Sequence, residues 1–196
     1  MLSLVLGTVA FILFFVYDIN SFTRKSVLLH SFFTVGAVLL TAASVLDMLH
    51  AVKSGAFSGA ADILLLLLGC AALACTVYSL FFALPFEETY VKDTEPHGVY
   101  DRGVYALCRH PGVLFYFIMQ LFFGLAALPD TIIINGMIFS AYNVLYAWFQ
   151  DRVTFPKTFS NYAEYRQHVP FLVPVPGSVA AAIKTLRKSK SGEDEQ

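Results

Sequence analysis

The stretch "AADILLLLLGCAALACTVYSLFFALPF", residues 60–86, decides the fold class of this chain. Its single charged residue is Asp62, near the beginning of the stretch. A hydrocarbon core about 30 Å thick is crossed by roughly 20 mostly apolar residues in a helix, so the stretch predicts a transmembrane helix. Because lipid offers the backbone no hydrogen-bond partners, other segments at membrane depth are expected to be helical as well.

The composition extends this prediction to the whole chain. Hydrophobic residues make up 57% and charged residues 14% of the 196 residues, which is typical of an integral membrane protein. The formal net charge of -1, with basic residues spread along the chain, argues against a nucleic-acid partner. Cys70, Cys75 and Cys108 do not have the spacing of metal ligands. We therefore expect them to be packing residues and predict neither a disulfide framework nor a metal site.

Five segments are apolar and long enough to cross a bilayer when flanking residues reach the headgroups. They are Leu2 to Tyr17, Val27 to Val52, Ala60 to Phe86, Gly112 to Leu128 and Thr131 to Trp148. The first has neither the basic leader nor the cleavage site of a signal peptide, so it is expected to remain as a helix of the mature protein. The predicted fold class is an all-α integral membrane protein with five transmembrane helices.

The basic residues predict the orientation of these helices. They follow the first span, lie between the third and fourth, and follow the fifth, whereas only Lys53 falls on the opposite side. Because Lys and Arg gather in cytoplasmic loops, the amino terminus is predicted outside and the carboxy terminus in the cytoplasm. A bacterial inner membrane and the endoplasmic reticulum both fit this orientation.

The connection "LPDT" between the fourth and fifth spans is short enough to make them an antiparallel hairpin. Their cytoplasmic ends, which carry "RHPG" and "WFQDR", are therefore expected to lie side by side. Beyond them, Ser178 to Leu186 predicts a short interfacial helix, and "RKSKSGEDEQ" predicts a disordered end.

Polar residues gather in "HGVYDRGVYALCRHPGV", residues 97–113, just before the fourth span. Pro111 suits the first turn of a helix, because its missing N–H has no helical partner there. The free N–H groups of a helix start, with Arg109 and His110 beside them, could bind an anionic group. A simpler alternative is that both cations are headgroup anchors. Gly103 and Gly112 permit close backbone approach or a positive φ.

This stretch resembles the signature "H-x-L-V-x-x-G-x-Y-x-x-x-R-H-P-x-Y" of the isoprenylcysteine carboxyl methyltransferase family and its phospholipid methyltransferase relatives. The matching residues of this first block are His97, Gly103, Tyr105, Arg109, His110 and Pro111. A second block of that signature, an acidic pair followed by an aromatic segment and "V-P", is similar to Gln150, Asp151, Phe159, Tyr162, Tyr165, Val169 and Pro170.

The resemblance implies S-adenosylmethionine (SAM) as a methyl donor that enters from the cytoplasm, and a lipophilic substrate that enters from the bilayer. Arg109, His110 and the helix start would complement the SAM carboxylate, and Asp151 with the nearby Gln150 would take its ammonium group. Tyr105 would face the sulfonium.

His97, the backbone near Val99, and Gly103 would hold the nucleoside end. Residues 87–175 then form the cofactor-binding catalytic core within a single membrane domain, after three helices in 1–86 and before the interfacial helix and tail in 176–196.

His168 departs from the family pattern at a position that bears on the chemical type of the substrate. It stands where prenylcysteine enzymes have arginine, which makes a carboxylate substrate less favoured. A neutral imidazole there could accept a proton from an amine, thiol or hydroxyl, with Tyr165 beside it in the catalytic set. The alternative is a surface histidine. Two other departures are Val113 in place of tyrosine and Gln150 in place of one acid.

Two other functions stay open at this point. One is a membrane reductase with a nicotinamide cofactor, and the other is a non-catalytic membrane subunit on the same scaffold. The oligomeric state is open as well. On the fifth span, Asn143, Tyr146 and Gln150 recur at helical spacing, so this polar stripe is expected to face protein rather than lipid.

Overall fold

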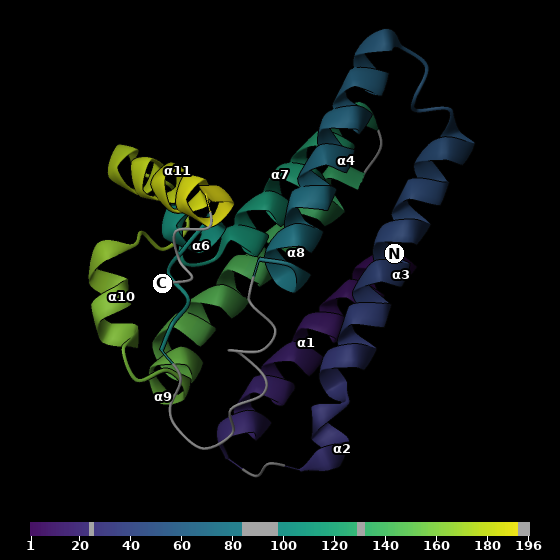
Figure 1. The fold of residues 1–196 in the computed structure, drawn as a ribbon. Coiled ribbons are helices and arrows are strands. Elements are labelled where there is room, and N and C mark those ends of the chain that lie inside the picture. Colours follow the sequence, from purple (N-terminus) through teal and green to yellow (C-terminus); the bar gives the residue numbers. More distant parts are fainter. Residues whose placement is uncertain (24–25, 84–97, 129–131, 192–196) are drawn as a thin grey trace. The chain divides into compact units, whose positions relative to one another are not determined.

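The computed structural model describes residues 1–23, 26–83, 98–128 and 132–191. Its elements are α1 (Leu2–Phe22), α2 (Val27–His30), α3 (Phe32–Ser54), α4 (Ala60–Phe81), α6 (Val104–Leu107), α7 (Pro111–Ala126), α8 (Ile132–Phe149), the π-helix η1 (Gln150–Thr154), α9 (Phe155–Thr158), α10 (Tyr162–His168) and α11 (Pro176–Ser191) (Figure 1). No strand occurs within those residues, which confirms the all-α prediction.

Four helical stretches in the described part of the chain are long and apolar enough to cross a membrane. They are Leu2–Phe22, Val27–Ser54, Ala60–Phe81 and Ile132–Thr158. The remaining apolar helix, α7, has 16 residues, so a fifth crossing stays a prediction. The chain is thus a helical membrane protein by the length and composition of its helices.

Local chemistry sets several helix ends. The Gly59 N–H donates to the Asp62 carboxylate at 2.8 Å, which caps the first turn of α4. Gly55, with φ of 72°, ends α3 in the left-handed conformation that glycine adopts without strain. The predicted start of α7 at Pro111 is confirmed.

Other predicted boundaries were wrong. α1 continues to Phe22 rather than ending at Tyr17, and α4 ends at Phe81 rather than Phe86. The second span runs from Val27 to Ser54, two residues beyond the predicted Val52, with a single turn at Ser31, whose hydroxyl donates to the Leu28 carbonyl at 2.7 Å. Near the carboxy terminus, α11 runs through to Ser191, so the predicted disorder from residue 187 is wrong up to that point. Its alanines and lysines are strong helix formers.

The chain divides into two compact units. Unit 1 comprises Met1–Leu73 and Tyr116–Thr154, and unit 2 comprises Ala74–Phe115 and Phe155–Gln196. Each unit is described by itself below. Both halves of the chain therefore contribute to each unit.

In unit 1, α1 packs against α3 and α8 around an aromatic core. Phe14 stacks on Tyr146 with ring centroids 5.7 Å apart. Gly36 of α3 permits close approach, because a Cβ atom there would lie 2.8 Å from the Phe14 ring. Small residues at such crossings let membrane helices gain van der Waals contact.

A polar contact also joins three helices of unit 1. The Asn135 side-chain amide on α8 donates to both carboxylate oxygens of Asp47 on α3, at 3.1 and 3.2 Å, and to the Ser3 hydroxyl on α1 at 3.3 Å. Hydrogen bonds of this kind stabilise helix association where no hydrophobic effect acts between helices.

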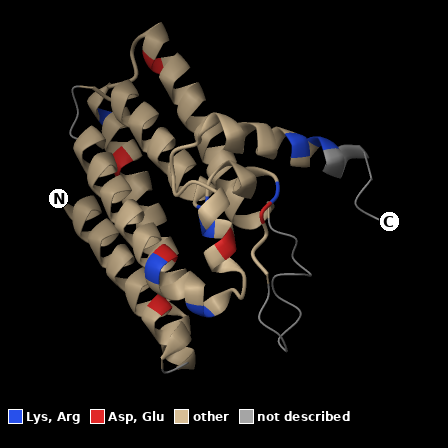
Figure 2. Ribbon diagram, turned by 90° about the vertical axis from the view of Figure 1, so that its left-hand side faces the viewer, with Lys and Arg blue, Asp and Glu red and all other residues tan. Residues whose placement is uncertain are grey.

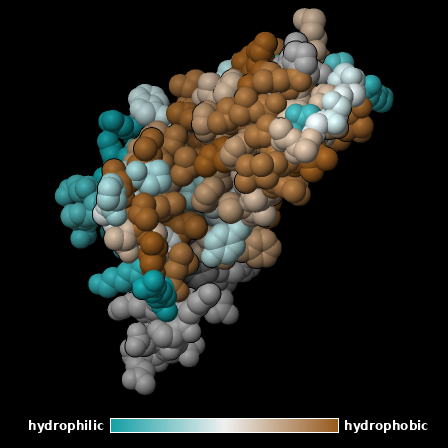
Figure 3. Space-filling view, turned by 90° about the horizontal axis from the view of Figure 1, so that it is seen from above, coloured by the Kyte–Doolittle hydropathy of each residue, from teal (hydrophilic) through white to brown (hydrophobic). Residues whose placement is uncertain are grey.

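The surface of the spans suits lipid. Large hydrophobic side chains are exposed along α3 and α4, among them Val38, Leu64 and Leu67, and hydrophobic atoms dominate the face drawn in Figure 3. Charged residues are sparse along these helices (Figure 2). Cys108 is buried, as predicted for a packing residue, whereas Cys70 and Cys75 are exposed on α4 and do not fill a core.

Candidate active site

In unit 2, the first block of the predicted motif and the aromatic part of the second block, from Phe159 to Pro170, fold against each other. The Val99 N–H donates to the Asn161 side-chain oxygen at 2.6 Å, and the Tyr165 hydroxyl donates to the Tyr105 carbonyl at 2.7 Å. The Tyr105 hydroxyl in turn donates to the Ser79 carbonyl at 2.8 Å. These hydrogen bonds join residues more than 20 positions apart in the sequence, so they are tertiary contacts rather than turns.

Arg109 is the most connected residue between the two blocks. Its backbone N–H donates to the Pro170 carbonyl at 2.9 Å, and its Nη1 donates to the carbonyls of Arg166 at 3.1 Å and Val169 at 2.6 Å. The Val169 carbonyl follows α10, where a cation complements the partial negative charge of a helix end. Arg109 therefore holds the second block in place, a role that the sequence did not predict.

His110 lies in an aromatic cluster. Its ring stacks on Phe155 at 5.7 Å with an interplanar angle of 13°, and meets the edge of Phe171 at 5.1 Å. Phe159 and Tyr162 extend the cluster from Phe155. The imidazole is buried, which favours a position inside the protein over that of a headgroup anchor.

Gly103 has φ of 59° and ψ of -130°, a conformation that a side chain would strain. Its N–H donates to the Thr185 hydroxyl of α11 at 2.9 Å. The positive φ foreseen for a loop glycine is thus confirmed at Gly103. Gly112 serves close packing instead, because a Cβ atom there would lie 3.0 Å from the Leu80 side chain.

Burial controls the ionisable groups at the centre of this site. It raises the pKa of the Cys108 thiol to about 11, against smaller opposing effects of the His110 N–H and the Arg109 charge. Burial likewise raises the pKa of Tyr165 above its ordinary value. The Tyr165 hydroxyl therefore stays protonated at neutral pH and acts as a donor to the backbone. His168, in contrast, is exposed in the last turn of α10.

The acidic part of the predicted site lies in unit 1. Gln150 and Asp151 open the π-helix η1, and Asp151 is only 2% exposed. Single π-helical turns within longer helices are frequent at functional sites. The expectation that this end lies beside "RHPG" stays a prediction, since that segment belongs to unit 2. His97 lies outside the described residues.

Sequence reasoning missed Asp18 of α1. This carboxylate is 3% exposed and is hydrogen-bonded to the side chains of Tyr146, Gln150 and Thr154, with 3.4 Å between the Thr154 hydroxyl and Asp18 Oδ2. Two of these partners, Gln150 and Thr154, are the first and last residues of η1. The signal was present in the sequence: an isolated acid in an apolar span is expected to have a polar partner.

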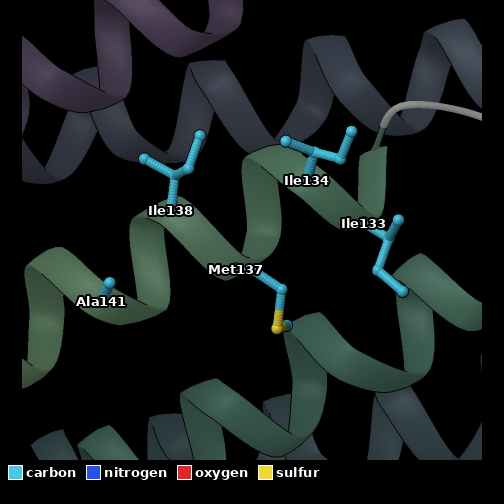
Figure 4. A pocket seen from close by; sticks show the side chains of 5 residues that line it. All are labelled: Ile133, Ile134, Met137, Ile138 and Ala141. Atoms are coloured by element: carbon cyan, nitrogen blue, oxygen red, sulfur yellow. The ribbon is translucent and has the colours of Figure 1, made fainter.

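A hollow of about 370 Å³ lies along α8. Its lining side chains, all from that helix, are Ile133, Ile134, Met137, Ile138 and Ala141 (Figure 4). With no polar group in the lining, it offers nothing to bind a charged cofactor.

Among the described residues, no group of three or more His, Cys, Asp or Glu side chains could hold a metal ion. Comparison with known proteins finds no family model, no curated protein and no solved structure that matches the chain.

Proposed function

We propose that this protein is a SAM-dependent methyltransferase that acts on a lipophilic substrate at the cytoplasmic face of the membrane. The observation that carries the proposal is the contact between the two motif blocks in unit 2. Val99 meets Asn161, Tyr105 meets Tyr165, and Arg109 meets Val169. A composite site of this family requires that the two blocks come together, and the resemblance alone did not require these pairings.

The chemical types of the candidate site residues suit the functional groups of SAM. A SAM molecule carries a carboxylate, an ammonium, a sulfonium and an adenine. As the resemblance implies, Arg109 would complement the carboxylate and Asp151 would pair with the ammonium. The aromatic rings around His110 offer apolar surface for an adenine.

When bound, SAM supplies an electrophilic methyl group on its sulfonium. The chain would position this group and exclude water, while the apolar spans would deliver a substrate that dissolves in lipid. His168 would accept a proton from an amine, thiol or hydroxyl nucleophile. The exposure of its side chain is compatible with this role.

Calorimetry on the detergent-solubilised protein tests the proposal with SAM, S-adenosylhomocysteine and NADPH. SAM and S-adenosylhomocysteine should bind, and NADPH should not. Binding of NADPH alone would support a nicotinamide-dependent reductase, whereas binding of none of the three would support a non-catalytic subunit.

A matched pair of variants ties the binding to the contact between the blocks. Asn161→Ala removes the acceptor of the Val99 N–H, so SAM affinity should fall about fivefold, the equivalent of one hydrogen bond of about 1 kcal/mol. Asn143→Ala, on α8, should leave the affinity unchanged. Equal effects of the two variants would contradict the composite site. A mass-spectrometric screen of lipid extracts with labelled SAM would then identify the substrate.

A further inference from the structure

The helix α11 presents three different faces. Its packing face consists of the buried Ser178 and Ala182 with the half-buried Thr185, and it rests on α6 in unit 2. The Thr185 hydroxyl accepts a hydrogen bond from the Gly103 N–H at 2.9 Å. This contact fixes which sides of α11 remain uncovered within unit 2.

The second face is an exposed apolar stripe. Val179, Ile183 and Leu186 are 39%, 47% and 42% exposed and recur at the three- and four-residue spacing of one helix face. Val173 and Val175, just before the helix, are exposed as well. A contiguous apolar surface of this kind marks an interaction site.

The third face is basic. Lys184 and Arg187 are exposed, and the helix sequence has no acidic residue between Pro176 and Ser191. In Figure 2 the blue residues of this helix lie toward its carboxy-terminal end.

We propose that α11 binds the surface of an anionic lipid bilayer and discriminates it from a zwitterionic one. An amphipathic helix with an apolar stripe and a cationic face lies in the interface, with its apolar side chains at the acyl boundary and its Lys and Arg at the lipid phosphates. The membrane-spanning helices of the same chain keep α11 at a high local concentration near such a surface.

The charge of the helix selects this partner over a second copy of the chain. Two copies that met through this face would bring Lys184 and Arg187 close to the same cations of the other copy, and like charges at an interface oppose association. Anionic headgroups complement them, and each cation near such a surface contributes about 1 kcal/mol, equivalent to about fivefold in binding.

The sequence also supplies a competitor for these cations. In the sequence, Glu193, Asp194 and Glu195 follow the helix after Ser191 and Gly192. Three carboxylates so soon after the cations of the helix in the sequence reduce the attraction of the whole segment to an anionic surface. Neutralising them should therefore strengthen lipid binding.

The test uses the full chain in nanodiscs of phosphatidylcholine alone and of phosphatidylcholine mixed with phosphatidylglycerol. A nitroxide attached at Ile183→Cys reports on the apolar stripe, and one attached at Ala181→Cys, on another side of the helix, is the control. The exposed Cys70 and Cys75 are replaced by alanine so that they do not react with the label. In the anionic discs, the label at 183 should become accessible to oxygen and protected from a water-soluble relaxant, while the label at 181 should not. At about 1 M salt, where the screening length falls to about 3 Å, the difference should shrink.

Charge variants sharpen the test. Lys184→Gln with Arg187→Gln should shift the equilibrium between inserted and free label about 25-fold toward the free form, the product of two fivefold losses. Glu193→Gln, Asp194→Asn and Glu195→Gln together should shift it the other way. Equal insertion in both lipids would overturn the proposal, as would a label at 183 that stays in water in both. Protection that depends on protein concentration instead of lipid charge would identify a second copy as the occupant.

Discussion

Asp18 offers a direct measure of how strongly α1 holds the π-helical segment. Replacing Asp18 with alanine removes the acceptor shared by Tyr146, Gln150 and Thr154. A buried donor left without a partner costs roughly 1–3 kcal/mol. Tyr146 is buried and bears most of that cost, although its side chain also hydrogen-bonds to Gln150. Gln150 is half-buried and can turn toward water, and the Thr154 contact is weak at 3.4 Å.

The expected loss in the free energy of unfolding is therefore about 2–4 kcal/mol for Asp18→Ala. Asp47→Ala is the matched control. Asp47 is half-buried and, among the described residues, accepts hydrogen bonds from Asn135, which also reaches Ser3, so its loss should stay below about 1 kcal/mol.

Unfolding in mixed micelles with increasing dodecyl sulfate measures these values, with the fluorescence of Trp148, the single tryptophan, as the probe. A double-mutant cycle isolates the main hydrogen bond: in a Tyr146→Phe background, the cost of Asp18→Ala should fall by about 1–2 kcal/mol. The reasoning is refuted if Asp18→Ala unfolds within about 0.5 kcal/mol of the parent, or if its cost is the same in both backgrounds.

Three further predictions concern the thiol, the histidine and the topology. Burial raises the pKa of Cys108 from 9.0 to about 11, so the unfolded chain loses the thiol proton at a lower pH than the folded protein does. The free energy of unfolding should therefore fall as pH rises from 9 to about 11, and Cys108→Ala should remove this fall in unfolding measured at different pH values. With the other cysteines replaced by alanine, alkylation of Cys108 at pH 8 should be at least about 100-fold slower in the folded protein than in the unfolded chain; equal rates would contradict its burial. If His168 is a general base, His168→Gln should lower turnover about 100-fold or more with unchanged SAM affinity; a variant with the parental turnover would return His168 to the surface. A cysteine at Ser58 should react with an impermeant reagent from outside, and one at Lys184 only after the cytoplasmic side is opened; the reverse pattern would contradict the proposed orientation.

Much of the fold could be predicted from short stretches of sequence. The membrane-length helices follow from local apolar content, because one helix of about 20 residues satisfies its own backbone within lipid. The start of α7 at Pro111 and the glycine conformation at Gly103 follow from single residues whose backbone limits are known. Two of the three residues of the predicted polar stripe face protein: Tyr146 is buried, and Gln150 hydrogen-bonds to Asp18.

For the candidate site, the sequence predicted which residues take part but not which partners they bind. The motif identified Arg109 and Tyr165, but spacing along the chain could not show that Arg109 Nη1 would hold two backbone carbonyls or that the Tyr165 hydroxyl would bind the backbone of Tyr105. Those partners lie more than 50 residues away, and several loop paths are compatible with the same motif.

By itself, the sequence determined that this is a helical membrane protein, because the need to satisfy backbone hydrogen bonds in lipid acts on each segment separately. Only the tertiary structure decided that Asp18 would bind the two ends of η1, that His110 would be buried among aromatic rings, and that α11 would rest on Gly103 and leave an apolar stripe uncovered. The physical reason is the separation along the sequence over which each kind of interaction acts. Helix formation depends on neighbours three or four positions apart, whereas the burial and the partner of a side chain depend on which distant segment packs against it.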